Sequence, residues 1–292
     1  MKIALFSIQY YEKYKETYQL LIDKLEKAEC EIWVNELFYG LIMNKVKFIN
    51  KPIIYNTAKE VKRKIDVFFT LGGDGTILDS IPIIRNSNIP ILGINMGRLG
   101  FLSSVSHTDI DAAINDVLNN NYILDKRALL SLKTDSNLFG EMNFALNEFS
   151  IHKKDHLSMI VVHVYIDDKF LNSYWSDGLL ISTPTGSTAY ALAVGGPIVT
   201  PGSKNFIISP IAPHNLTVRP VVIPDNSEIK LKIQGRSKSF LVGLDSRFET
   251  ISSSTELVVS KSNFSVNMIQ IGNRSFFDTI REKLNWGLDI RN

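Results

Sequence analysis

An apolar run that ends directly at a cluster of glycines most constrains the fold of this chain. Residues 65–71 are apolar at nearly every position, which is typical of a strand buried on both faces of a sheet. Gly72-Gly73-Asp74-Gly75-Thr76 follows, and Ile77 to Arg85 then has the composition of a helix despite Pro82. A buried strand that turns through glycines into a helix indicates an α/β fold with a parallel sheet.

The same alternation runs through the first 120 residues. We predict strands at residues 2–8, 30–34 and 89–94, and helices at 11–27 and 108–119. Apolar residues recur there either in short continuous runs or at helical spacing. The pattern predicts a Rossmann-like α/β domain over residues 1–122, with helices packed on both faces of a parallel sheet.

Beyond residue 122 the pattern changes. Residues 123–272 contain successive β-rich runs separated by turn residues, with almost no helical periodicity, and predict a second, β-rich domain. Residues 275–286 return to an apolar stripe at helical spacing behind Ser275. We expect this C-terminal helix to pack back onto the first domain, which would then comprise residues 1–122 and about 273–292.

Composition narrows the class of protein. The 292 residues are 45% hydrophobic and 21% charged, as in ordinary globular proteins, and the net charge is only +2. Neither nucleic acid nor a membrane surface is therefore an expected partner.

A single cysteine, Cys30, excludes an internal disulfide. With no signal peptide and no apolar stretch long enough to span a bilayer, the expected location is the cytoplasm.

The glycine turn predicts a phosphate site. Glycines let the backbone approach a phosphate closely, and the amides at the start of a helix attract anions. Asp74 would then be a metal-associated group or a base that accepts a hydroxyl proton. The alternative is a tight turn in which Asp74 only caps the helix. The chain has neither a P-loop nor the usual dinucleotide fingerprint.

A second glycine-marked turn, Gly93 to Leu102, follows the next predicted strand. Consecutive parallel strands end at the same edge of a sheet, where α/β folds bind their ligands. Arg98 in this turn is a candidate phosphate contact, although an arginine on a loop is more often simply solvated.

Two segments of the β-rich half are candidates for nucleoside contacts. Thr183 to Tyr190 is dense in hydroxyl groups, which can bind a ribose, and its tyrosine can stack on a base. The alternative is a strand and turn that is merely rich in serine and threonine. Asn147-Glu148 is either a simple turn or an amide and a carboxylate presented to a nucleoside. The five histidines have no metal-ligand spacing with Cys30, so a zinc site is not expected.

In this order, the segments resemble the NAD kinase family from about residue 65 to residue 225. The matching set is Gly72 to Thr76, Gly93 to Leu102, Asn147-Glu148, Ser176 to Pro197, Pro213-His214 and Arg219-Pro220. The first pentapeptide is shared with lipid kinases and 6-phosphofructokinases, whereas its combination with Thr185 to Tyr190 is specific to NAD kinases.

The resemblance implies a reaction in which ATP and NAD give ADP and NADP, with Mg²⁺. The 2′-hydroxyl of the adenosine ribose would attack the γ-phosphorus of ATP, and Asp74 is the family's candidate base. The resemblance also implies a site in a cleft between the two domains and a homodimer or homotetramer.

Site residues follow from the same resemblance. The expected NAD contacts are Asp74, Gly75, Asn147, Glu148, Asp177, Thr188, Ala189, Tyr190, Ala191, Leu192 and Ala193. The expected phosphate or ATP contacts are Gly72, Gly73, Gly75, Thr76 and Arg98. Further candidate contacts are Trp175, Ser187, Ala212 and Arg247; metal ligands are not assigned.

At two of these positions the chain departs from many relatives. Trp175 stands where they have a smaller or charged residue, and would bear on the choice between NAD and NADH. Arg247 lies near a position that is often glutamine, and would contact a phosphate or pair with Glu249.

Other functions fit the sequence less well. A lipid kinase would need a further small-residue phosphate loop downstream, and a phosphofructokinase would need an α/β second half. A non-catalytic nucleotide sensor would gain little from a carboxylate such as Asp74 beside phosphates.

Overall fold

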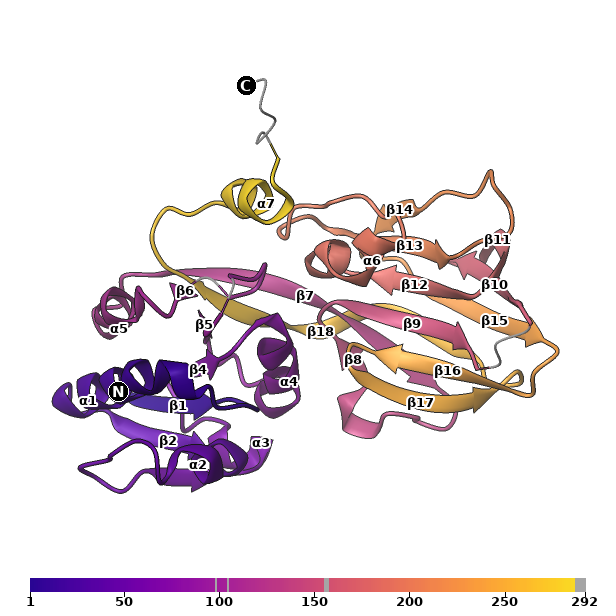
Figure 1. Cartoon of the computed structure of the whole chain (residues 1–292). Coiled ribbons are helices and arrows are strands. Elements are labelled where there is room, and N and C mark those ends of the chain that lie inside the picture. The colour runs from indigo at the N-terminus through magenta and orange to yellow at the C-terminus, as the bar shows by residue number, and fades with distance from the viewer. Residues whose placement is uncertain (98, 104, 155–157, 287–292) are drawn as a thin grey trace. The chain divides into compact units, whose positions relative to one another are not determined.

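A computed structural model describes residues 1–97, 99–103, 105–154 and 158–286. The chain divides into two compact units, of which the first comprises residues 1–126 and 266–292 and the second residues 127–265. Each unit has its own hydrophobic core. Figure 1 shows the helices gathered mainly in the first unit and the strands that dominate the second. No helix in the described part of the chain is long and apolar enough to cross a bilayer.

The first unit contains a parallel sheet in the order β5-β4-β1-β2-β3. Its strands are β1 (Lys2–Phe6), β2 (Glu31–Asn35), β3 (Ile53–Tyr55), β4 (Val67–Leu71), β5 (Ile91–Asn95) and β6 (Val105–Ser106), the last paired with β5. Every residue of β4 and β5 is buried, as the continuous apolar runs predict.

Helices cover both faces of this sheet. They are a 3₁₀ turn (Glu12–Tyr14), α1 (Lys15–Lys27), α2 (Glu36–Ile42), α3 (Ala58–Val61), α4 (Asp74–Ile84) and α5 (Ile110–Leu118). A further helix, α7 (Phe276–Leu284), is assigned to the same unit. In α5 the buried residues Ile110, Ala113, Ile114 and Val117 recur at helical spacing and join the same core as α1. The helix α4 packs on the opposite face, where Ile77 lies against β5 at Gly93.

The predicted helix after the glycine turn is real, but its predicted start is wrong. The helix α4 begins at Asp74 rather than at Ile77, so the last three residues of the pentapeptide form its first turn. Pro82 lies inside the helix, as expected. The C-terminal helix begins behind Ser275, whose side chain accepts a hydrogen bond from the Asp278 amide in a capping box. This helix belongs to the first unit.

The second unit is built from two antiparallel groups of strands. One has the order β14-β13-β12-β9-β16-β17, and the other contains β11-β10-β15-β18 with β7 and β8. The strands are β7 (Ile123–Thr134), β8 (Phe144–Ala145), β9 (Glu148–Lys153), β10 (Ile160–Ile166), β11 (Lys169–Ser176), β12 (Gly178–Ser182), β13 (Asn205–Ile211), β14 (Val221–Pro224), β15 (Ile229–Gly235), β16 (Ser239–Leu244), β17 (Arg247–Ser252) and β18 (Leu257–Gln270). The start of β7 and the end of β18 belong to the first unit, where Met268 of β18 pairs with Ile91 of β5. Short turns of 3₁₀ helix (Gly140–Met142 and Thr185–Thr188) and α6 (Tyr190–Ala193) complete it.

Side-chain alternation gives the β9-β12-β16 sheet one apolar and one polar face. Phe149 and Ile151 of β9 point into the core together with Leu179 and Ile181 of β12. Glu148, Ser150 and His152 alternate with them along β9 and point to the opposite face. Glu148 and Tyr190, two of the nucleoside contacts expected from the sequence, lie on or beside this polar face.

Candidate functional site

The glycine turn joins β4 to α4 at the carboxyl edge of the parallel sheet. The Gly72 amide donates to the Ile94 carbonyl of β5 at 2.9 Å, which ties the turn to the neighbouring strand. A Cβ on Gly72 would lie 2.1 Å from Thr76 Oγ1, so only glycine fits there. Gly73 and Gly75 are exposed at the start of α4, where helix amides lack intrahelical partners. The turn thus presents backbone donors at the positive end of a helix.

Asp74 is held by the loop that follows β5. Its Oδ2 accepts a hydrogen bond from the Phe101 amide at 2.7 Å. Its Oδ1 accepts from the Leu102 amide at 3.0 Å, the Ser103 amide at 3.1 Å and the Ser103 hydroxyl at 3.3 Å. Among the described residues, the carboxylate makes no capping bond to its own helix, whose N-cap is Gly73. The Asp74 side chain instead connects the two glycine-marked turns, which the sequence predicts to lie at the same edge of the parallel sheet.

Two glycines make this close approach geometrically feasible. A Cβ on Gly100 would lie 1.8 Å from Asp74 Oδ1, and a Cβ on Gly93 would lie 2.9 Å from the Ser103 Cα. Both distances are shorter than non-bonded atoms tolerate, so side chains at these positions would displace the loop or the carboxylate. Arg98, the expected phosphate contact of this loop, lies outside the described residues.

In the second unit, Asp245 organises the segment that contains Asn147 and Glu148. Its carboxylate accepts hydrogen bonds from the amides of Leu146 and Asn147, both at 2.8 Å, and of Glu148 at 3.1 Å. The Asp245 amide donates back to the Glu148 carbonyl at 3.0 Å. This reciprocal clamp fixes the backbone from which the Asn147 and Glu148 side chains project.

Both of these side chains keep unused hydrogen-bonding capacity. Asn147 Oδ1 and Glu148 Oε2 are buried and have no hydrogen-bond partner among the described residues. Buried polar atoms are nearly always paired in folded proteins. Two unpaired buried oxygens on adjacent residues therefore indicate a place for a polar ligand. Burial, reinforced by the nearby Asp245 carboxylate, raises the pKa of Glu148 to about 8.

The raised pKa predicts how stability depends on pH. The unfolded chain ionises Glu148 near its ordinary value of 4.5, whereas the folded chain keeps it protonated up to about 8. The stabilisation is complete below 4.5 and is lost as pH rises toward 8, by up to about 1.4 kcal/mol for each unit between the two pKa values. We expect Glu148→Gln to flatten the fall in unfolding free energy over this window, measured by urea titration at a series of pH values.

Glu249→Gln is the matched control, because that carboxyl lies exposed on β17. It should leave the pH dependence of stability unchanged. Equal slopes for the wild type and Glu148→Gln would show that Glu148 ionises normally in the folded protein.

The segment rich in hydroxyl groups forms a compact turn beside Asn147. Thr183 Oγ1 donates to the Leu146 carbonyl at 2.6 Å, and the Thr183 amide donates to the Asn147 carbonyl at 2.9 Å. A Cβ on Gly186 would lie 2.2 Å from the Asn147 carbonyl oxygen. Arg127, which is buried, donates from Nη1 to Thr185 Oγ1 at 3.2 Å. The structure thus brings together two candidate segments, Asn147-Glu148 and Thr183 to Tyr190, that are far apart in the sequence.

An aromatic group lies on the polar face of the same sheet. The Tyr190 ring is nearly parallel to the His152 ring, with an interplanar angle of 13° and centroids 6.1 Å apart. Phe248 lies 6.4 Å from His152. Tyr190 is 40% exposed and Phe248 54% exposed, so both retain ring surface for a flat ligand. Burial lowers the pKa of His152.

The remaining candidates differ in their surroundings. Asp177 forms an ion pair with Lys153, whose Nζ lies 2.5 Å from Asp177 Oδ1. The Ser187 hydroxyl is buried and donates to the Pro184 carbonyl at 2.7 Å. Trp175 is 55% exposed on β11. Ala212 has a positive φ of 45°, which is unusual for alanine.

Arg247 has partners that neither sequence-based alternative named. Its guanidinium donates to the carbonyls of Met142 and Phe144 and lies over the Phe144 ring. These contacts fix the turn before β8 in place. They occupy the nitrogens Nη1 and Nη2.

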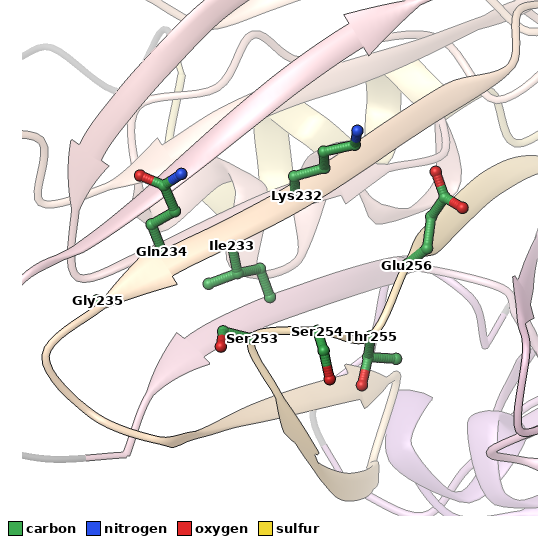
Figure 2. Close-up of a pocket in the computed structure, with 8 residues that line it drawn as sticks. All are labelled: Lys232, Ile233, Gln234, Gly235, Ser253, Ser254, Thr255 and Glu256. Carbon is green, nitrogen blue, oxygen red and sulfur yellow. The ribbon is translucent and has the colours of Figure 1, made fainter.

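A separate groove in the second unit contains none of the expected site residues. It has a volume of about 510 Å³ and is lined by Lys232, Ile233, Gln234 and Gly235 of β15 and by the segment Ser253 to Glu256 (Figure 2). Within the described residues, no group of three or more histidine, cysteine or acidic side chains is placed to hold a metal ion.

Several residues of the site carry no local signal in the sequence. Ser103, Arg127 and His152 lie in ordinary strand or loop contexts, and their roles depend on partners distant in the chain. For Asp245 the sequence contains one indication of a role in the site, because this aspartate comes shortly after a glycine, in Gly243-Leu244-Asp245.

Comparison with known proteins identifies the family. The family model described as ATP-NAD kinase N-terminal domain matches residues 6–122, and that described as ATP-NAD kinase C-terminal domain matches residues 146–271. The chain is 46% identical to an NAD kinase of Cytophaga hutchinsonii over 274 residues, which is 94% of each chain. It is 43% identical to an NAD kinase of Flavobacterium psychrophilum over 294 residues and the full length of both.

Solved structures share the fold. Yeast NADH kinase complexed with NADH superposes with a TM-score of 0.88 at 24% identity, covering 99% of this chain and 89% of the yeast chain. An NAD kinase from Archaeoglobus fulgidus in complex with ATP gives 0.75 at 23% identity, covering 98% and 99%. These likenesses confirm the predicted combination of an α/β and a β-rich part. The chain therefore belongs to the NAD kinase family and is a phosphotransferase that acts on NAD, with an alcohol group as acceptor.

Proposed function

We propose that this chain transfers the γ-phosphoryl group of Mg-ATP to the 2′-hydroxyl of the adenosine ribose of NAD, with Asp74 as the general base. The observation that carries the proposal is the fixed position of the Asp74 carboxylate at the glycine turn. A ribose hydroxyl is a poor nucleophile at neutral pH, so a positioned acceptor for its proton assists the attack.

The two carboxylate oxygens are not equivalent. Oδ1 accepts three hydrogen bonds from Leu102 and Ser103, whereas Oδ2 accepts one from Phe101. An ionised carboxylate oxygen has two lone-pair sites, so Oδ2 keeps one available. We assign to Oδ2 the proton that leaves the 2′-hydroxyl as the new oxygen–phosphorus bond forms and the bond to the ADP oxygen breaks.

The donor phosphates would lie at the glycine turn. The exposed backbone donors of Gly73 and Gly75, together with the positive end of α4, would stabilise negative charge on the transferring group. The amides of Gly72 and Thr76 are bonded to the carbonyls of Ile94 and Gly73, so we assign to these two residues the shape of the phosphate turn. Mg²⁺ typically reaches a protein with the nucleotide phosphates and few protein ligands. When bound, the ion would neutralise charge on the triphosphate.

The dinucleotide would lie on the polar side of the second unit. The unpaired buried oxygens Asn147 Oδ1 and Glu148 Oε2 support contacts to its hydroxyl or amino groups. The exposed faces of Tyr190 and Phe248 support contact with a ring. We assign the remaining contacts to Asp177, Gly75 and the segment Thr188 to Ala193, with Ser187, Ala212, Trp175 and Arg247 as outer candidates.

The internal bonds of two outer candidates define narrower roles for them. Because the Arg247 guanidinium holds the carbonyls of Met142 and Phe144, we propose that it supports the Asn147 segment rather than a phosphate. The buried Ser187 hydroxyl would likewise shape the turn. We further propose a cytoplasmic homodimer or homotetramer, with functional domains of residues 1–122 plus 273–292 and 123–272.

A product assay tests the proposal. The purified protein is incubated with NAD and Mg-ATP or, separately, with polyphosphate, and NADP is detected with an NADP-specific dehydrogenase. We expect NADP to form with Mg-ATP and to require the divalent ion. Absence of NADP with both donors, from protein shown to be folded by circular dichroism, would contradict the proposal.

A further inference from the structure

Ser103 makes hydrogen bonds that leave its hydroxyl only one orientation. The residue is 2% exposed. Its Oγ accepts from Asn95 Nδ2 at 3.0 Å and from the Gly100 amide at 3.2 Å, and lies 3.3 Å from Asp74 Oδ1. A hydroxyl has two acceptor sites and one hydrogen. With both acceptor sites taken by nitrogen donors, the hydrogen is directed to Asp74.

Asn95 is fixed in turn by the backbone. The Gly97 amide donates to Asn95 Oδ1 at 2.6 Å, which identifies that atom as the carbonyl oxygen of the side chain. The other terminal atom is then the NH₂ group, which faces Ser103. Asn95 is 2% exposed at the carboxyl end of β5. Two backbone amides, those of Gly97 and Gly100, therefore set the direction of the whole chain of bonds.

This chain of bonds ends on one oxygen of the carboxylate. Oδ1 receives the Ser103 hydroxyl in addition to the amides of Leu102 and Ser103. That oxygen has no lone pair left for a substrate proton. The carboxylate is also prevented from rotating about its Cβ–Cγ bond, since rotation would break these bonds together.

We propose that Ser103, oriented by Asn95, is a positioning residue for Asp74, holding Oδ1 in place together with the two amides so that Oδ2 faces the ribose hydroxyl as the proton acceptor. The inference rests on the proposed function, because it assigns a role to the base of that reaction. It adds two side chains to the catalytic arrangement, neither of which touches the reacting atoms.

Steady-state kinetics of Ser103 variants test this role. We expect Ser103→Ala to lower kcat roughly tenfold while leaving the KM values for NAD and ATP unchanged, in line with couplings within hydrogen-bonded networks. Ser103→Thr, which keeps the hydroxyl, should restore kcat. Ser103→Cys keeps the side-chain size with a weaker donor and should fall between them, which covers the case that the alanine variant does not fold.

A double mutant separates positioning from a general structural effect. In an Asp74→Asn background, Ser103→Ala should cause no further loss of kcat, because the residue acts through the Asp74 carboxylate. The same fractional loss in both backgrounds would overturn the proposal. So would a wild-type kcat in Ser103→Ala, or a failure of Ser103→Thr to restore it.

Ser80→Ala is the matched control for the loss of a buried serine hydroxyl. Ser80 is fully buried in α4, and its hydroxyl donates to the Ile77 carbonyl at 2.7 Å. We expect this variant to retain wild-type kcat. If the wild type forms no NADP, the proposed function fails. If it forms NADP and Asp74→Asn does not, while Ser103→Ala equals the wild type, only the positioning role fails.

Discussion

We expect Asp74→Asn to lower kcat by about 10² to 10⁴, the usual contribution of a general base. Asparagine retains a carbonyl oxygen for the Leu102 and Ser103 donors that now bind Oδ1. Its NH₂ group replaces Oδ2, has no lone pair for the ribose proton, and faces the Phe101 amide, which is also a donor. The substitution therefore removes the proton acceptor while the fold keeps most of its contacts.

Binding measurements distinguish this loss from misfolding. The dissociation constant for NAD, measured by calorimetry, should stay close to that of the wild type. Asp23→Asn is a suitable control, because Asp23 is exposed on α1, where it accepts a hydrogen bond from Gln19 at 2.7 Å, and its kcat should be unchanged. An Asp74→Asn enzyme as active as this control would show that Asp74 is not the base.

The second large effect is expected from Gly100→Ala. The new Cβ would lie 1.8 Å from Asp74 Oδ1 and within 2.6 Å of Oδ2. The carboxylate cannot move aside without losing its bonds to the 101–103 loop, so it would take up a different position. Displacements of about 1 Å in a catalytic site commonly cost around 10²-fold in rate. We expect a loss of kcat of that order.

Gly97→Ala provides the comparison within the same loop. Its new Cβ would meet Asn95 Oδ1 at 3.7 Å, an ordinary contact distance. We expect Gly97→Ala to retain most of the wild-type kcat. The difference between the two alanine variants then measures the effect of the clash between the Gly100→Ala side chain and Asp74. Equal activities for the two alanine variants would contradict the importance of the Asp74 clamp.

The elements of the first unit were predictable because their signals are local. Continuous apolar runs marked β4 and β5, and helical spacing marked α5 and the helix behind Ser275. The start of α4 was not predictable in this way. Glycine and aspartate have low helix propensity, and burial of Thr76 and Ile77 stabilises the first turn instead.

The contacts that build the site were less accessible from the sequence. The residue types at Asp74, Asn147 and Glu148 pointed to phosphate and nucleoside chemistry. The partners that hold these side chains could not be predicted, because Asp74 is held by residues 27 to 29 positions away. Asp245 likewise holds residues 97 to 99 positions away. Such pairings depend on which strands become neighbours, and a single sequence carries no local trace of them.

The most direct test of the proposed reaction identifies the product and the atom that is phosphorylated. NAD is converted with Mg-ATP and the purified protein, and the product is analysed by ³¹P NMR with correlation to the ribose protons. We predict a single new phosphomonoester resonance coupled to the 2′ proton of the adenosine ribose. A phosphomonoester on another hydroxyl, or none at all, would contradict the claim that this site phosphorylates the 2′-hydroxyl of NAD.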